Sequence, residues 1–135
     1  MAWSIDTTSW DDSLTNWYNT STPFNYYSAC QGEITLQDED NSGDSWDGLT
    51  TYTSVSGSTI EGAAVALNGW YTNSYTSEER DSVSGHELGH ALGLADLVGG
   101  AEVMNGQTCG SNSRFCYYTV WGPQSDDVNG VNALY

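Results

Sequence analysis

The stretch that decides the fold reads His86-Glu87-Leu88-Gly89-His90-Ala91-Leu92-Gly93-Leu94-Ala95-Asp96, a pattern of the form H-E-x-x-H-x-x-G-x-x-D. His86 and His90 are four residues apart, and on an α-helix this spacing places two side chains on one face, one turn apart. Two imidazoles in that arrangement can bind one cation, and imidazole nitrogen suits zinc. The pattern therefore predicts a helix that carries two zinc ligands.

The third ligand must come from another part of the chain. A catalytic zinc has three protein ligands and one open position, and the chain has only two histidines. A carboxylate or a thiolate is therefore expected. Gly93 can adopt the left-handed conformation that ends a helix and reverses the chain, which would bring Asp96 back to the metal. We predict His86, His90 and Asp96 as the zinc ligands.

Glu87 follows His86 on the predicted helix. Its side chain would lie beside the metal, where it could act on a water that the metal holds. We therefore expect Glu87 to be the general base of a zinc hydrolase. A purely structural zinc site is disfavoured, because such sites usually have four protein ligands and the sequence supplies three.

The same stretch resembles the signature of the metzincin clan of zinc endopeptidases, H-E-x-x-H-x-x-G-x-x-H/D followed by a methionine turn. Aspartate at the last position is similar to the snapalysin-type small secreted neutral proteases, whereas matrixins have histidine there. The segment Ala101-Glu102-Val103-Met104-Asn105-Gly106 resembles the Met-turn, in which the methionine, here Met104, lies below the metal without binding it. Residues 124–135 are similar to the C-terminal helix of matrixins. The resemblance covers roughly the C-terminal two-thirds of the chain.

The resemblance implies an α+β fold of metzincin type, in which a twisted mixed β-sheet packs on an active-site helix, followed by a Met-turn and a C-terminal helix. It implies one metalloprotease catalytic domain over residues 1–135, with a sheet and active-site helix in 1–93 and a smaller C-terminal subdomain in 94–135. The length fits a single domain with a sizeable core. The chain departs from the family at Gly106, where some metzincins carry a tyrosine that binds the metal.

The expected function is that of a secreted, monomeric zinc endopeptidase that hydrolyses protein or peptide substrates, with Glu87 as general base. Two alternatives stay open, a non-catalytic zinc-containing binding module and an amidase that acts on cell-wall peptides. Loss of the base would favour the binding module, and Glu87 is present. Residues 1–6 do not resemble a signal peptide, so we expect the leader of a secreted form to have been removed.

The chain is strongly acidic. Eighteen acidic residues stand against two arginines and no lysine, which gives a formal net charge of −16. Such a surface repels phosphate and excludes nucleic acids as partners. No apolar run approaches the length that spans a membrane, so no membrane partner is expected. Salt would screen the self-repulsion, and the composition fits either a salt-adapted protein or an ordinary acidic secreted protein.

An acidic loop follows a strand predicted at residues 33–37. Its oxygen donors alternate before Gly43, as at the start of a calcium-binding loop, and the resemblance to small metzincins favours structural calcium. Leu49 stands where an EF-hand has its last glutamate, and calcium needs six or more oxygens, so a solvated acidic turn is the alternative. The candidate calcium ligands are Asp38, Asp40, Asp44 and Asp47.

A second strand is predicted at residues 63–68, an apolar run between Gly62 and Gly69. In metzincins the strand that precedes the active-site helix pairs with bound substrate, and addition of a peptide to a sheet edge is a known recognition mode. An ordinary buried strand is the alternative. The candidate substrate edge consists of Ala64, Val65, Ala66, Leu67 and Asn68.

Helices are predicted at residues 10–18, from Ser77 to Leu92, and after Ser125. The central helix is preceded by Thr76-Ser77-Glu78-Glu79, which has the form of a capping box. Gly85 and Gly89 are costly inside a helix, which predicts close packing against the sheet. Short strands are expected at residues 1–6 and 24–28, a loop at 70–75 and a turn at 57–59.

Three cysteines leave one unpaired within the chain. Cys109 and Cys116 are close in sequence within a polar loop, and we expect a disulfide between them, which implies an oxidising compartment. Cys30 would then be the odd residue, buried as cysteines often are. The competing interpretation, three cysteines as metal ligands, is disfavoured because the chain has no C-x-x-C spacing.

Overall fold

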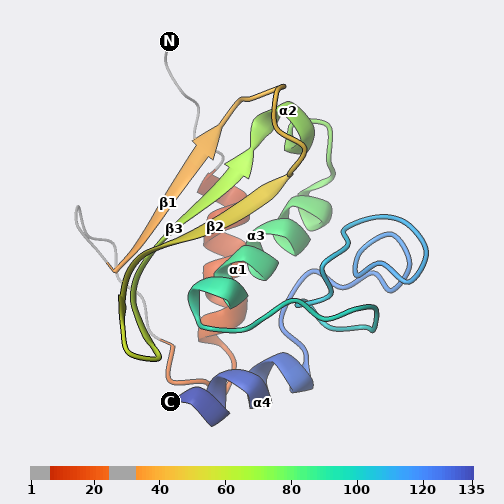
Figure 1. Ribbon diagram of the computed structural model, residues 1–135. Helices are drawn as coiled ribbons and strands as arrows, with labels where there is room; N and C mark the ends of the chain where they lie inside the picture. Colours follow the sequence, from red (N-terminus) through yellow and green to blue (C-terminus); the bar gives the residue numbers. More distant parts are fainter. Residues whose placement is uncertain (1–6, 25–32) are drawn as a thin grey trace.

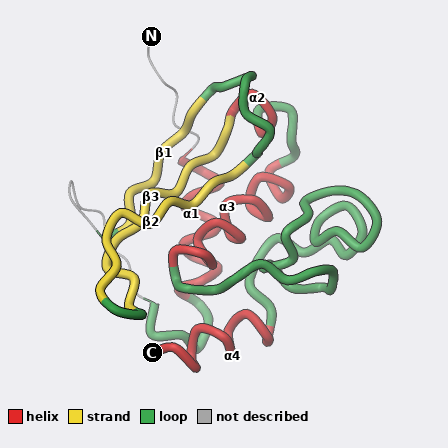
Figure 2. Tube along the Cα trace, in the orientation of Figure 1, coloured by secondary structure: helices red, strands yellow, loops and turns green. Residues whose placement is uncertain are grey.

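The computed structural model describes residues 7–24 and 33–135, and it confirms an α+β fold (Figures 1 and 2). The strand predicted at residues 1–6, all but the first residue of the strand predicted at 24–28, and Cys30 lie outside the described residues. No helix within the described ranges is both long enough and apolar enough to cross a membrane. The described elements are α1 (Thr7–Tyr18), β1 (Ile34–Glu39), β2 (Gly48–Ser56), β3 (Thr59–Asn68), α2 (Gly69–Thr72), α3 (Ser77–Ala91) and α4 (Ser125–Leu134).

The sheet is mixed and has the order β1-β3-β2 among the described strands, with β1 parallel and β2 antiparallel to β3. The prediction that residues 64–68 form a sheet edge is therefore wrong. Ala64 of β3 pairs with Thr35 on one side and with Thr51 on the other. An apolar strand is best buried when it has neighbours on both sides, and Val65 is fully buried. Within the described part of the chain, β2 is the strand that leaves an edge open next to α3.

β2 itself was not predicted. Its sequence, Gly-Leu-Thr-Thr-Tyr-Thr-Ser-Val-Ser, lacks the apolar alternation of a half-buried strand, and most of its residues are exposed. Its threonines, tyrosine and valine nevertheless favour extended backbone. The turn predicted at residues 57–59 is confirmed, because it joins β2 to β3, with Gly57 at a φ of 62°.

Helix α3 lies between the sheet and α1 (Figure 1). It contacts β2 and β3 on one side, and α1 contacts it on the other. Trp17 of α1 is fully buried there and donates a hydrogen bond from Nε1 to the carbonyl of Gly85 at 3.0 Å. Leu88 and Val83 are also fully buried, so α3 forms the centre of the hydrophobic core.

Both ends of α3 are determined by local sequence. At the N-terminus, Thr76 accepts a hydrogen bond from the backbone N–H of Glu79 at 3.2 Å, as the capping signal predicted. At the C-terminus, the N–H groups of Gly93 and Leu94 donate to the carbonyls of His90 and Gly89 at 2.9 and 3.0 Å. This is a Schellman motif, and Gly93 has the positive φ of 96° that the motif requires.

The loop predicted at residues 70–75 is wrong at its start, because α2 occupies Gly69–Thr72. Asn68 caps this short helix by accepting a hydrogen bond from the N–H of Trp70 at 3.1 Å. The same fully buried side chain donates to the carbonyls of Asn41 and Trp46, so it also holds the acidic loop between β1 and β2.

The prediction that Gly85 and Gly89 pack against the sheet is wrong, because both glycines face away from it. A Cβ at position 89 would overlap Sδ of Met104 and lie 3.3 Å from Trp17, whereas a Cβ at position 85 would lie 3.5 Å from Val103, an ordinary contact. The glycine at 89 is therefore required by the approach of Met104 on the side of α3 away from the sheet.

We predict that the same glycine-to-alanine change has different effects on stability at positions 85 and 89 of α3. Gly85→Ala and Gly89→Ala gain the same helix propensity, about 1 kcal/mol. Gly89→Ala must in addition displace the buried Met104, and overpacking of a filled core costs about 1–3 kcal/mol. Urea unfolding should therefore show Gly89→Ala to be less stable than Gly85→Ala by about that amount. Equal free energies of unfolding would contradict the packing described for Met104.

Candidate metal centre

Three ligand-type side chains converge at the C-terminal end of α3. Nε2 of His86 and Nε2 of His90 are 3.1 Å apart, and Oδ1 of Asp96 lies 3.2 and 3.3 Å from these two nitrogens. Ligands that surround zinc tetrahedrally at about 2.0–2.1 Å are about 3.3–3.4 Å from one another. The three atoms that the sequence predicted as zinc ligands therefore have nearly the mutual spacing of a tetrahedral zinc site.

The backbone fixes the orientation of both imidazole rings. Nδ1 of His86 is 2.9 Å from the carbonyl of Val103, and Nδ1 of His90 is 2.8 Å from the carbonyl of Leu94. A carbonyl only accepts, so Nδ1 is the protonated nitrogen in each neutral ring, and Nε2 presents an electron pair to the centre. Hydrogen bonding of the outer nitrogen is a common feature of histidines that bind metals.

His86 is uncharged at neutral pH. Burial, assisted by the positive charge of Arg114 and by His90, lowers its pKa to about 3. Its contact with Asp96 is therefore not an ion pair. Two imidazole nitrogens and a carboxylate oxygen converge here, and zinc takes both kinds of atom as ligands, so the donor set fits a zinc cation at its centre.

Asp96 is positioned by the segment that contains Met104. The N–H of Leu97 donates to the carbonyl of Met104 at 2.8 Å, and the N–H of Gly106 donates to the carbonyl of Leu97 at 3.1 Å. A Cβ at position 106 would lie 3.2 Å from Oδ1 of Asp96. Gly106 therefore leaves room for the Asp96 carboxylate at the position where some metzincins have a tyrosine.

Met104 is buried, and its backbone is held by α4. Asp127 accepts hydrogen bonds from the N–H groups of Val103 and Met104 at 2.9 and 3.1 Å, and from that of Gln124 at 2.7 Å in a capping box. The carbonyl of Val103 is the group that orients His86. The role of Asp127 could not be identified from the sequence, because its contacts with residues 103 and 104 carry no local sequence signal.

Glu87 directly follows His86 in α3, and its carboxylate is not among the three clustered ligand atoms. Its carboxylate is buried, and Oε2 accepts a hydrogen bond from Oγ1 of Thr50 at 2.8 Å. Burial raises the pKa of Glu87, and the Thr50 hydrogen bond opposes part of that rise. A carboxyl with a raised pKa is suited to general acid–base chemistry near neutral pH.

One side of the centre is open to solvent. The Asp96 side chain is 62 % exposed and that of His90 is 20 % exposed, whereas that of His86 is 6 % exposed. Structural zinc sites are closed by four protein ligands, and catalytic sites keep one position accessible. The exposure pattern is that of a centre which a substrate could reach.

The acidic loop does not form a comparable cluster. The metal-type clusters found among residues 7–24 and 33–135 include none of the four calcium candidates, Asp38, Asp40, Asp44 and Asp47. The Asp38 carboxylate accepts from Trp10, Asp44 from Asn41, and Asp47 from Tyr75 and Thr108. These hydrogen bonds direct three of the carboxylates to different parts of the protein, so the structure does not bring together the expected calcium ligands.

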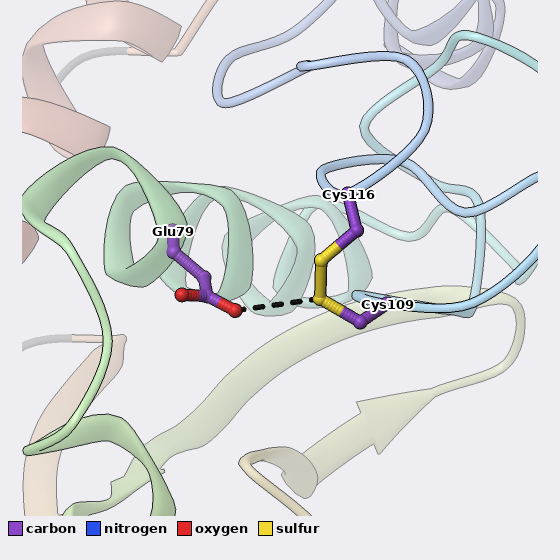
Figure 3. Close-up of side chains that lie close together, drawn as sticks. All are labelled: Glu79, Cys109 and Cys116. Carbon is purple, nitrogen blue, oxygen red and sulfur yellow. Dashed lines mark hydrogen bonds between the residues drawn. A yellow bond between two sulfur atoms is a disulfide. The ribbon is translucent and has the colours of Figure 1, made fainter.

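A second group of ligand-type side chains lies at the other end of α3. The predicted disulfide joins Cys109 to Cys116, and Glu79 lies beside it in the first turn of α3 (Figure 3). Oε1 of Glu79 is 3.4 Å from Sγ of Cys109. Both sulfurs are used in the covalent bond and thiolates are needed to bind a metal, so this group is not a metal site in the oxidised protein.

Arg114, inside the disulfide-closed loop, is almost completely buried. Its guanidinium donates to the carbonyls of Ser82 and Asn105 at 3.1 and 2.8 Å and to Oγ1 of Thr108 at 2.7 Å. These bonds connect the loop to α3 and to the residue that follows Met104. This role could not be predicted from local sequence, because an isolated arginine is usually exposed.

Comparison of the sequence with models of known protein families and with curated proteins gave no match. The functional inference therefore depends on the geometry of the metal centre and on the residues that surround it.

We predict that the chain binds one zinc ion and that Asp96→Ala lowers its affinity more than about 100-fold, because a catalytic site with three protein ligands loses one of them. Competition with a chromophoric chelator measures the dissociation constant. Asp40→Ala is the control, because it removes another exposed carboxylate, from the acidic loop. It should leave the zinc affinity within about threefold of that of the parent protein. Equal affinities for Asp96→Ala and the parent protein would exclude Asp96 as a ligand.

Proposed function

We propose that the protein is a zinc-dependent endopeptidase whose metal ligands are His86, His90 and Asp96 and whose general base is Glu87. One observation carries the proposal. Three ligand-type atoms meet at 3.1–3.3 Å with an open side, and the residue after His86 carries a buried carboxylate with a raised pKa that is not part of the cluster. Metal-assisted hydrolysis requires metal ligands, a general base and an open side through which a substrate can reach the metal.

Zinc bound by these residues would supply Lewis acidity, which polarises a substrate carbonyl and lowers the pKa of a water. Glu87 accepts the proton of the attacking water at its carboxylate and returns it to the leaving amine. Burial supports the first step, because a carboxyl with a raised pKa holds a transferred proton more readily than one in water. No histidine remains to stabilise an oxyanion, since both are ligands.

The open edge of β2 favours a peptide as substrate. An extended peptide can add to a free strand edge through backbone hydrogen bonds, and alternate side chains then provide specificity. Exposed apolar side chains lie on β2 and directly after Asp96, and they could contact the side chains of such a peptide. These residues are Leu49, Tyr52, Leu97 and Val98.

The arrangement also supports the finer assignment to a metzincin-type fold. A mixed sheet packs on the helix with both histidines, Gly93 turns the chain toward Asp96, and Met104 packs beneath that helix against Gly89. In this assignment residues 1–93 and 94–135 are the two parts of one catalytic domain. The disulfide fits an oxidising compartment, and we propose that the protein acts outside the cell as a monomer.

Calcium has weaker support than zinc, since the candidate carboxylates of the acidic loop form hydrogen bonds with different protein groups. The two alternative functions differ from the proposal in different respects, one in the role of Glu87 and the other in the substrate. A binding module needs no oriented base, whereas an amidase on cell-wall peptides would use the same chemistry on another substrate. A panel of substrates that contains both proteins and cell-wall peptides distinguishes the amidase from the endopeptidase.

We expect Glu87→Gln to keep one zinc per chain and to lose peptidase activity by about 100- to 10,000-fold, the range for loss of a general base. Hydrolysis of casein and of a fluorogenic peptide measures the activity, and cell-wall peptides are assayed in parallel. Glu78→Gln is the matched control, because it removes an exposed carboxylate from the first turn of the same helix and should change kcat/KM less than about twofold.

Two results would contradict the proposal. The first is a zinc-loaded parent protein that cleaves neither protein nor peptide at low or high salt. The second is a Glu87→Gln variant that is as active as the parent. Cleavage of cell-wall peptides alone would replace the endopeptidase with the amidase.

A further inference from the structure

Alternate residues of β2 face the helix that carries the proposed active site. Residues two apart on a strand point to the same side, and Gly48, Thr50 and Tyr52 all lie against α3. Oγ1 of Thr50 is 2.8 Å from Oε2 of Glu87, and the hydroxyl of Tyr52 donates to the carbonyl of His90 at 3.1 Å. This row of β2 therefore contacts the two ends of the H-E-x-x-H stretch.

Gly48 provides the space that the Glu87 side chain occupies. A Cβ at position 48 would lie 2.7 Å from Cγ of Glu87 and 2.6 Å from Cγ1 of Val83. Both distances are closer than carbon atoms approach without a clash. The Glu87 side chain thus passes against bare backbone at Gly48 before its carboxylate reaches the Thr50 hydroxyl.

We propose that Thr50 is a positioning residue that fixes the Glu87 carboxylate in the orientation required for proton transfer. The inference rests on the proposed role of Glu87 as general base. The Thr50 hydroxyl engages Oε2, whereas Oε1 lies on the side of Gly48 and forms no hydrogen bond with Thr50. A glutamate side chain has three rotatable bonds, and a charge-assisted hydrogen bond limits the conformations that it samples.

The hydroxyl has two acceptors within reach and only one proton to donate. Oγ1 of Thr50 is 2.8 Å from the backbone carbonyl of Glu87 as well as from its Oε2. If the proton served only the carbonyl, Thr50 would be a structural residue that joins β2 to α3. If it serves the carboxylate, Thr50 determines where the base lies. These two roles predict different experimental results.

The positioning role also links the binding of a peptide at β2 to the position of the Glu87 carboxylate. β2 is the strand whose open edge is proposed to receive the peptide, and the same strand holds Glu87 through Thr50. A peptide added to β2 would therefore be aligned relative to the carboxylate by a single rigid element. Misplacement of a catalytic group by about 1 Å can cost about 100-fold in rate, so this alignment has a measurable effect.

Steady-state kinetics of zinc-loaded variants provides the first test. Thr50→Val removes the hydroxyl and keeps the shape, and we expect kcat to fall about 10- to 100-fold while KM stays within about threefold. Thr50→Ser restores the hydroxyl and should recover kcat to within about threefold of the parent. The zinc dissociation constant should change less than about threefold in both variants, because Thr50 contacts no ligand atom.

The second test uses the metal-free protein and does not depend on activity. Unfolding equilibria are measured for Thr50→Val, Glu87→Ala and the double variant. Thr50→Val raises the unfolding equilibrium constant by some factor in the parent. If the hydroxyl bonds the carboxylate, that factor is at least about fivefold smaller in the Glu87→Ala background. A hydroxyl that bonds only the backbone carbonyl costs the same in both backgrounds. Thr51→Val, on the exposed face of the same strand, is the control and should be additive with Glu87→Ala.

Unchanged kcat in Thr50→Val, failure of Thr50→Ser to recover it, or additive unfolding effects would overturn the positioning role. Thr50→Ala replaces Thr50→Val in both tests if the valine variant does not fold. If the parent protein cleaves no peptide, the proposed function fails, and the unfolding cycle still decides whether Thr50 holds the Glu87 carboxylate.

Discussion

His86 Nε2, His90 Nε2 and Asp96 Oδ1 approach one another to 3.1–3.3 Å, and the helix end, the turn at Gly93 and the segment around Met104 are arranged about this contact. To bind a metal, these three side chains must be held at this spacing and with these atoms facing one another. The chain therefore has to hold them in place through groups outside the cluster. The turn at Gly93 presents the carbonyl of Leu94 to His90, and the segment around Met104 presents the carbonyl of Val103 to His86. One helix and one irregular segment thus orient the entire donor set.

The irregular segment between α3 and α4 is stabilised by buried polar side chains in place of regular secondary structure. Asp127 accepts from the backbone at residues 103 and 104, and Arg114 donates to Ser82, Asn105 and Thr108. Burying a charge is costly unless its hydrogen bonds are satisfied. In a chain of net charge −16 with two arginines, one arginine, Arg114, lies in the interior. Burial lowers the pKa of its guanidinium, and the nearby Asp47, Glu87 and Asp96 oppose part of that fall.

Local signals in the sequence were sufficient to predict α3 and the donor set. Histidines one turn apart, a threonine cap and a glycine at the C-terminus each act within a few residues, so no knowledge of the fold was needed. β2 was missed because its mostly polar, exposed residues have no apolar period, and this omission made β3 look like an edge. Thr50, Asp127 and Arg114 were missed because their partners lie 37, 24 and 32 residues away. The hydrogen bonds that Asp38 and Asp47 accept could not be predicted for the same reason, since their donors Trp10 and Thr108 are distant in sequence.

The most direct test of this account is a crystal structure of the zinc-loaded protein with anomalous diffraction recorded on both sides of the zinc absorption edge. The account predicts one zinc peak, about 2.0–2.2 Å from Nε2 of His86, Nε2 of His90 and a carboxylate oxygen of Asp96, with Glu87 outside the coordination sphere. A peak at any other group of side chains, or coordination of zinc by Glu87 in place of Asp96, would contradict it.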